Sequence, residues 1–311
     1  MAEDQGYNGD VWNKQACVLL GKLGWTKVGD YDIDIEGDDN KDYGIDSLFK
    51  YMDVRKSLIE QGVILESKRY KTTSFRNGDL QKWINRINTK INKLKHSQPF
   101  SEKFPEFNLT SFNNGIIFIW FSNHVDYIQN RESFINSLTE VKLSKSRTNA
   151  IFNRIYVLEN NAILKLCSII DSMEKINRDK DVKLEYYYPT SDKTSNPIYR
   201  GNLLTIDYMF SKFILAEGKT KSGELNRIVF YFGNLEKTSF QTLYSGLNNI
   251  GFIDYNIPLA IYTFERSDQF RKILPDLQEL FSRSIDNVHL DVEFKEMEVF
   301  GDLPTFLREI E

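Results

Sequence analysis

Two short segments of the sequence decide the fold, Gly44-Ile45-Asp46 and, further along, Val63-Ile64-Leu65-Glu66-Ser67-Lys68-Arg69-Tyr70. The second segment begins with a continuous apolar run, as in a buried central strand, and charge then appears abruptly. Strand side chains alternate with period two, so Glu66 and Lys68 project to the same face. If the segment that begins at Gly44 forms the neighbouring strand, Asp46 joins them there.

The three side chains suit hydrolysis of a phosphodiester bond. Two carboxylates that share a face repel each other unless a cation lies between them, and hard oxygen ligands of this kind suit Mg²⁺. A lysine beside them can position or deprotonate the attacking water and offset charge on the phosphate. Plainer alternatives are that Glu66 and Lys68 form an exposed pair on an edge strand, and that Asp46 caps the turn after Gly44.

Helices are predicted on both sides of these strands. Apolar spacing predicts an amphipathic helix over Trp12–Leu23, with Asp10 as the candidate N-cap. A second, basic helix is predicted over Leu80–Lys95, capped by Asp79. Its apolar stripe consists of Trp83, Ile84, Ile87, Ile91 and Leu94. Four basic residues lie off this stripe and are expected to face outward as one ridge: Lys82, Arg86, Lys90 and Lys93.

The remaining pattern predicts a mixed α/β sheet flanked by helices, followed by a second, smaller α+β domain. Further strands are expected at Gly115–Phe121 and Arg154–Leu158, and a helix at Ala162–Met173. Residues 1–175 are predicted as the first domain, 176–211 as an irregular connection and 212–311 as the second domain. In the second domain strands are expected at Lys212–Ala216, Ile228–Phe232, Leu259–Phe264 and His289–Phe294, and helices at Ser239–Asn249 and Gln269–Ser282.

The charge distribution is uneven along the 311 residues. The net charge of −4 argues against a generic polyanion binder. Acids nevertheless dominate residues 30–46, and bases dominate residues 68–95. An acidic block beside a basic one fits a cation site next to a phosphate-binding surface. The alternative is two solvated faces that pair with each other, which charge alone favours.

Other features bound the class of protein. The two cysteines, Cys17 and Cys167, lie among apolar residues and are expected as buried free thiols, not as a disulfide framework or a zinc cluster. Trp25, Trp83 and Trp120 are expected in the core. The N-terminus lacks the features of a signal peptide, and no apolar run approaches the roughly 20 residues of a membrane span. The sequence therefore predicts a soluble, cytoplasmic protein without a membrane segment.

At this point the sequence resembles the PD-(D/E)xK nuclease superfamily over about residues 7–160. It is most similar to the restriction-endonuclease-like proteins of the Mrr type and their relatives in bacterial anti-phage defence systems. The resemblance implies that Asp46 and Glu66 bind Mg²⁺, or alternatively Mn²⁺, and that Lys68 assists catalysis. Many members also carry a carboxylate on the first helix. Here that helix offers Gln15, with Asp10 at its start.

The leading hypothesis is a Mg²⁺-dependent DNA endonuclease that acts in anti-phage defence. Arg69, Lys71 and the basic ridge would contact the DNA backbone. The C-terminal domain would regulate, dimerise or bind a partner, and a separate protein subunit is expected as sensor or gate. One alternative is a DNA-binding or DNA-end-binding subunit that uses a nuclease fold without cleaving. Another is a purely structural subunit. The choice between DNA and RNA stays open, as does a homo-oligomeric state.

Overall fold

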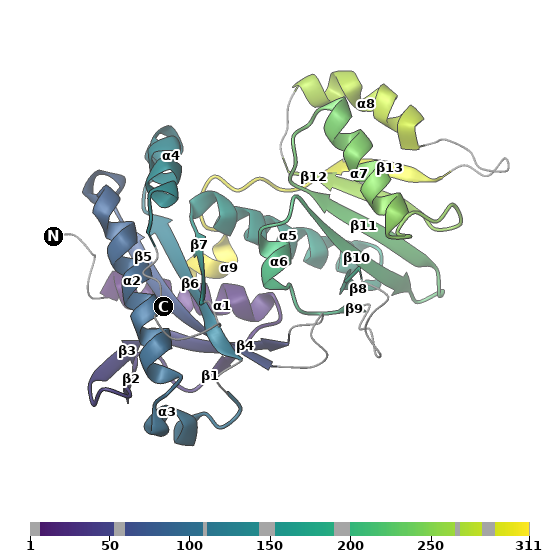
Figure 1. The fold of residues 1–311 in the computed structure, drawn as a ribbon. Coiled ribbons are helices and arrows are strands. Elements are labelled where there is room, and N and C mark those ends of the chain that lie inside the picture. The colour runs from purple at the N-terminus through teal and green to yellow at the C-terminus, as the bar shows by residue number, and fades with distance from the viewer. Residues whose placement is uncertain are drawn as a thin grey trace. The chain divides into compact units, whose positions relative to one another are not determined.

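The computed structural model describes residues 7–52, 60–107, 111–142, 153–189, 200–264, 268–281 and 290–310. The chain divides into two compact units (Figure 1). The first comprises Met1–Leu164 together with Gly301–Glu311, and the second comprises Lys165–Phe300. The candidate site lies in the first unit.

A five-stranded mixed sheet forms the centre of the first unit, with the strand order β1-β4-β5-β6-β7. Its strands are β1 (Thr26–Val28), β4 (Ser47–Met52), β5 (Glu60–Tyr70), β6 (Phe112–Phe121) and β7 (Arg154–Leu158). β5, β6 and β7 run parallel, while β4 is antiparallel to both β1 and β5. β5 is the central strand, which is why its middle residues, Val63-Ile64-Leu65, form a continuous apolar run.

Helices α1 (Tyr7–Lys22) and α2 (Asn77–Leu94) cover opposite faces of this sheet. Ile64 of β5 packs in the apolar cluster that contains the stripe of α2. Ser67, three residues later, projects to the other face and contacts α1 through Asn13. All five residues of the predicted α2 stripe are buried: Trp83, Ile84, Ile87, Ile91 and Leu94. The alternation along β5 thus assigns Glu66 and Lys68 to the face that α2 covers.

Smaller elements complete the first unit. They are the hairpin β2 (Ile33–Glu36) and β3 (Asp42–Ile45), the 3-10 turn η1 (Thr72–Ser74), and the helices α3 (Gln98–Lys103), α4 (His124–Thr139) and α9 (Thr305–Arg308). α2 starts earlier than predicted, because Arg76 is its N-cap. The Asp79 carboxylate accepts the backbone N–H of Arg76 and so closes a capping box from inside the helix.

The second unit contains a six-stranded sheet of order β13-β12-β11-β10-β8-β9. Its strands are β8 (Val182–Tyr187), β9 (Arg200–Gly201), β10 (Phe213–Thr220), β11 (Leu225–Tyr231), β12 (Leu259–Thr263) and β13 (Val292–Glu296). The helices are α5 (Asn160–Asp179), which begins in the first unit, α6 (Ile206–Met209), α7 (Lys237–Asn249) and α8 (Asp268–Phe281). The predicted fold class, a mixed α/β sheet with helices and a second sheet domain, is confirmed.

The irregular connection predicted over residues 176–211 is wrong. β8 lies within it and pairs with β10, and α6 follows. The physical signal is the alternation of Val182, Leu184 and Tyr186, which are buried, with more exposed residues between them. Aromatic and polar composition concealed this period-two pattern. The end of the chain also departs from prediction, because residues 301–311 fold with the first unit.

Three tryptophans and the two cysteines occupy the positions expected from the sequence. Trp25, Trp83 and Trp120 are buried, and both cysteines are buried free thiols, as predicted. None of the described helices is both long enough and apolar enough to cross a membrane. Two predicted residues, His289 and Ser282, lie outside the described part of the chain.

Candidate active site

Asp46 lies at the break between β3 and β4, beside the centre of β5. The register pairs Ser47 with Leu65, which brings the preceding residue, Asp46, next to Glu66 on the adjoining strand. The Asp46 carboxylate does not cap the turn after Gly44. Its Oδ2 instead accepts the backbone N–H of Ser67 at 2.8 Å. Asp46 is therefore held against the strand that carries the other two candidate residues.

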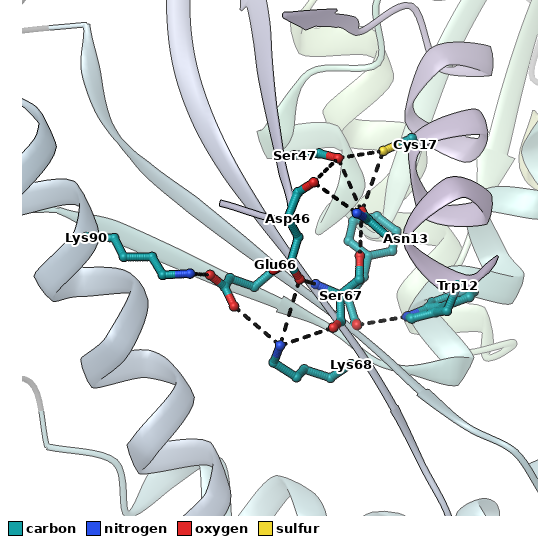
Figure 2. Close-up of polar contacts among 10 residues, drawn as sticks. Trp12, Asn13, Cys17, Asp46, Ser47, Glu66, Ser67, Lys68 and Lys90 are labelled. Atoms are coloured by element: carbon teal, nitrogen blue, oxygen red, sulfur yellow. Dashed lines mark hydrogen bonds and ion pairs between the residues drawn. The ribbon is translucent and has the colours of Figure 1, made fainter. Parts of the chain in front are cut away.

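Glu66 and Lys68 project from β5 to the same face as predicted, and they meet Asp46 there (Figure 2). The Lys68 Nζ lies 3.3 Å from Glu66 Oε2 and 3.8 Å from Asp46 Oδ2. It also donates to the backbone carbonyl of Ser67 at 3.2 Å. Glu66 and Lys68 are only 2% and 4% exposed and belong to the central strand of the sheet, so the alternative of an exposed edge pair is wrong.

Lys90 is a fourth charged residue at this site, and its position corrects the predicted ridge. Its side chain leaves α2 toward the sheet and forms an ion pair with Glu66 Oε1 (Figure 2). It is 2% exposed. The sequence predicted that Lys90 faces outward, but it adjoins the apolar stripe at Ile87 and Ile91. A buried carboxylate directly opposite stabilises the ammonium, while the apolar stem packs with the stripe.

The pKa values of the two carboxyl groups move in opposite directions. Burial acts to raise the pKa of Glu66, but the ammonium groups of Lys90 and Lys68 outweigh it and hold that pKa below its ordinary value. Burial, followed by repulsion from Glu66, raises the pKa of Asp46, and Lys68 offsets only part of this. Glu66 is thus the firmly ionised member of the pair, while the charge on Asp46 is disfavoured until more positive charge arrives.

Asn13 of α1 supports the site from the opposite face of the sheet. Its Nδ2 donates to the Asp46 carbonyl at 2.9 Å, and its Oδ1 accepts from the hydroxyls of Ser47 and Ser67 at 3.2 and 3.3 Å. The Asp46 carbonyl also accepts from the backbone N–H of Asp32. Asn13 therefore links the Asp46 backbone to the side-chain hydroxyls of Ser47 on β4 and Ser67 on β5. Sequence reasoning missed it, although a polar residue within the apolar face of α1 was the available signal.

Neither candidate for a third metal ligand lies at the site. Gln15 is buried, and its Nε2 donates to the backbone carbonyl of Leu307 in α9. Asp10 is exposed in the first turn of α1. Among the described residues, no hydrogen bond or ion pair joins either of them to Asp46 or Glu66.

The other predicted nucleic-acid contacts take different positions. Lys82 and Arg86 are exposed on α2, and the charge of Arg86 is among those that lower the pKa of Glu66. Lys71 is exposed after β5, and Arg69 is half-buried within it. Lys93 forms ion pairs with Asp38 and Asp39 in the acidic segment. At this point the acidic and basic blocks pair with each other, as one of the two interpretations of the charge distribution predicted.

The donor atoms present fit a hard divalent cation. Oxygen atoms of Asp46, Glu66 and Ser67 all contact the Lys68 ammonium, so the chain already gathers three oxygens around one positive charge. Within the described ranges, no group of three or more His, Cys, Asp or Glu side chains could hold a metal. Mg²⁺ needs only one or two carboxylates in nuclease-type sites, because it keeps several of its waters. Asp46 and Glu66 are the residues that would hold it.

A central Glu-x-Lys strand, a carboxylate from the neighbouring antiparallel strand and helices on both faces define a nuclease of the PD-(D/E)XK class. Residues 1–162, just over half of the chain, match the family described as the GAPS4 protein PD-(D/E)XK nuclease domain, and the chain belongs to this family. GAPS4 is an anti-phage defence protein, and the nuclease family implies a phosphodiester hydrolase. No curated protein and no solved structure matches the chain.

Proposed function

We propose that the first unit is a Mg²⁺-dependent endonuclease that hydrolyses the DNA backbone, with Mn²⁺ as an alternative metal. The observation that carries this proposal is the convergence of Asp46, Glu66 and the Ser67 carbonyl on the Lys68 ammonium. Three buried charges, on Glu66, Lys68 and Lys90, beside the half-buried Asp46 carboxylate are unfavourable for stability alone. Their presence is explained by a reaction that brings a cation and a phosphate to the same point.

In this function Asp46 and Glu66 hold the cation, and Lys68 acts on the phosphate side. When bound, the cation stabilises charge on the phosphate and lowers the pKa of the attacking water. The Lys68 ammonium donates to a non-bridging phosphate oxygen and orients the water for attack on phosphorus. A bond forms between the water oxygen and phosphorus, one P–O ester bond breaks, and the leaving oxygen acquires a proton.

The approach of the nucleic acid follows the exposed cations nearest the site. Lys82 and Arg86 lie one helical turn apart on α2, so they share a side of that helix. The charge of Arg86 is among those that lower the pKa of Glu66. Lys71 and Arg69 continue from the end of β5. Contacts of this kind bind the backbone without reading sequence, so a weakly sequence-selective nuclease is expected.

An unselective nuclease endangers the cell that makes it, so its activity must be gated. We place this role in a second protein subunit that acts as sensor or gate, with the second unit of this chain as its binding partner. A homo-oligomer held by the same unit is the alternative arrangement. The site of action is proposed to be the cytoplasm, where invading DNA is found.

The test is incubation of the purified chain with supercoiled plasmid DNA and Mg²⁺, with and without the protein encoded next to it in the genome. Wild-type protein should nick or linearise the plasmid, and EDTA should stop it. Glu66→Ala and Lys68→Ala should abolish both cleavage and phage protection at equal expression. Equal phage protection by wild type and both variants would contradict the catalytic function and favour a DNA-binding subunit that does not cleave.

A further inference from the structure

Both oxygens of Glu66 are occupied by ammonium groups that come from different elements. Lys68 of β5 contacts Oε2, and Lys90 of α2 contacts Oε1 (Figure 2). With Asp46 the cluster holds two carboxylates and two ammonium groups, so its formal charges cancel. The resemblance to the nuclease superfamily assigns roles to Asp46, Glu66 and Lys68 only. Lys90 is therefore a buried cation to which that resemblance assigns no role.

A divalent cation bound at Glu66 and the Lys90 ammonium would both neutralise the negative charge of the Glu66 carboxylate. In a buried place the attraction of each for the carboxylate is strong, and so is their mutual repulsion, because little solvent screens it. A cation that joined the four existing charges would leave the cluster with a net charge of +2. Metal binding is then opposed until Lys90 withdraws or anions arrive.

The anions required are those of the proposed reaction. A phosphodiester contributes one negative charge, and a deprotonated attacking water contributes another. Lys90 has a long flexible stem and lies one turn after Arg86 on α2, so a phosphate backbone that lies along Arg86 offers its ammonium an alternative partner.

We propose that Lys90 is an internal competitor of the divalent cation at Glu66, which keeps metal affinity low until a nucleic-acid backbone engages the site. This inference rests on the proposed metal-dependent function. Lys90 acts here as a positioning residue: it holds Glu66 in place without metal and releases it when the phosphate arrives. The consequence is a nuclease whose metal binding and substrate binding reinforce each other, which limits idle hydrolysis.

The experiment measures Mn²⁺ binding to the full chain by electron paramagnetic resonance in the absence of nucleic acid. Lys90→Met removes the ammonium but keeps an apolar stem, and it should bind Mn²⁺ at least about tenfold more tightly than wild type. Lys90→Arg keeps the charge and should bind like wild type. Lys95→Met is the matched control, because it removes the charge of a half-buried lysine at the end of the same helix.

The coupling to nucleic acid has its own measurement. A short duplex with a phosphorothioate backbone, which resists hydrolysis, should raise the Mn²⁺ affinity of wild type, and it should raise that of Lys90→Met much less. An unchanged or weaker Mn²⁺ affinity for Lys90→Met would overturn the inference. So would a duplex effect of equal size in both proteins.

Folding of the variant provides a further readout, because Lys90→Met leaves Glu66 with one partner fewer. Mn²⁺ should raise the melting temperature of Lys90→Met by more than it raises that of wild type. An equal or smaller rise overturns the inference. If Lys90→Met is unfolded without metal, Mn²⁺ should refold it, and failure to refold also overturns the inference.

The double variant Glu66→Gln with Lys90→Met removes both charges and should show no gain in Mn²⁺ affinity. A gain that persisted in it would mean that Lys90 does not act through Glu66, and this too overturns the inference. Failure of the proposed function gives a different result. In that case Asp46→Asn would not abolish Mn²⁺ binding in wild type or in any variant.

Discussion

The backbone N–H of Ser67 donates to Oδ2 of Asp46 at 2.8 Å, across 21 positions of sequence. A side-chain oxygen thereby accepts a hydrogen bond from β5 at the residue between the end of β3 and the start of β4. The bond positions the Asp46 carboxylate beside Glu66 and Lys68, and it survives any replacement that keeps an oxygen acceptor. Charge and position at Asp46 can therefore be separated by mutation.

Asp46→Asn should lose cleavage while keeping the fold. The amide oxygen still accepts from Ser67, but the charge that would hold the cation is gone. We expect a loss of activity on the order of a thousandfold, as when one charge-stabilising group is removed from an active site. Plasmid cleavage and thermal unfolding measured on the same preparation check this. Retained cleavage would remove Asp46 from the metal site.

The difference in melting temperature between Asp46→Asn and wild type should also depend on pH in a defined direction. The pKa of Asp46 is raised by burial and by Glu66, so the folded protein disfavours the charged form. Its contribution to stability is present at low pH and is lost as pH rises through the raised pKa. Asp46→Asn should therefore melt at or above the wild-type temperature at pH 7, and the difference should shrink as the pH falls toward 4. Clear destabilisation at pH 7 would show that the charge itself supports the fold.

Asn13→Ala tests the support behind the site. It removes one of the donors to the Asp46 carbonyl and the shared acceptor of the Ser47 and Ser67 hydroxyls, so we expect a loss of about 1–3 kcal/mol in stability and a partial loss of cleavage. Gln15→Ala is the matched control, because it removes another buried amide of α1, one that contacts Leu307. The control should lose stability but not cleavage. A loss of cleavage in the Gln15 variant alone would restore Gln15 as a metal-ligand candidate.

The core of the site was predictable from sequence because it depends on local periodicity. A period of two assigns Glu66 and Lys68 to one face of a strand, and a helical period assigns Ile87 and Ile91 to the stripe that packs on it. Lys90 was assigned to the wrong face because periodicity describes one element at a time. Only the juxtaposition of α2 with β5 shows that a carboxylate faces the edge of the stripe.

Tertiary pairing also explains the other elements that the sequence did not predict. β8 is only six residues long and depends on its partner β10, so its weak alternation was masked by aromatic and polar composition. α4 is stabilised by burial of Tyr127 and Phe134, and its N-cap is Asn123, which accepts the backbone N–H of Asp126. Such short or half-exposed elements are stabilised by packing more than by intrinsic propensity.

Both thiols should resist alkylation in the folded protein. Burial raises the pKa of Cys17 to about 11 and that of Cys167 to about 12, and only the thiolate is reactive. At pH 8 iodoacetamide should label neither cysteine in native buffer and both in concentrated urea, as mass spectrometry would report. Rapid labelling of Cys17 without denaturant would mean that α1 separates readily from the sheet behind the site.

The exposed cations of α2 should supply a measurable part of the affinity for DNA. Lys82 is 78% exposed at its side chain, and Arg86 is exposed one turn further along, whereas Lys90 is buried against Glu66. The pair to exchange is therefore Lys82 with Arg86. If each contacts one phosphate, the double change to Gln should flatten the log–log dependence of binding on salt by about 1.8, from about 0.9 per contact on duplex DNA.

The measurement is a salt titration of duplex binding by fluorescence anisotropy, with Ca²⁺ in place of Mg²⁺ to prevent cleavage. The charge-matched control is Lys41→Gln with Lys103→Gln, which changes the net charge equally at two exposed positions elsewhere in the first unit. This control should keep the wild-type slope. The slope reports counterions released where a cation contacts a phosphate, and a change of net charge away from the DNA releases none. If the slope is unchanged in the Lys82 and Arg86 variant, α2 faces a protein partner or solvent. The DNA path would then follow Lys71 and Arg69 or the second unit.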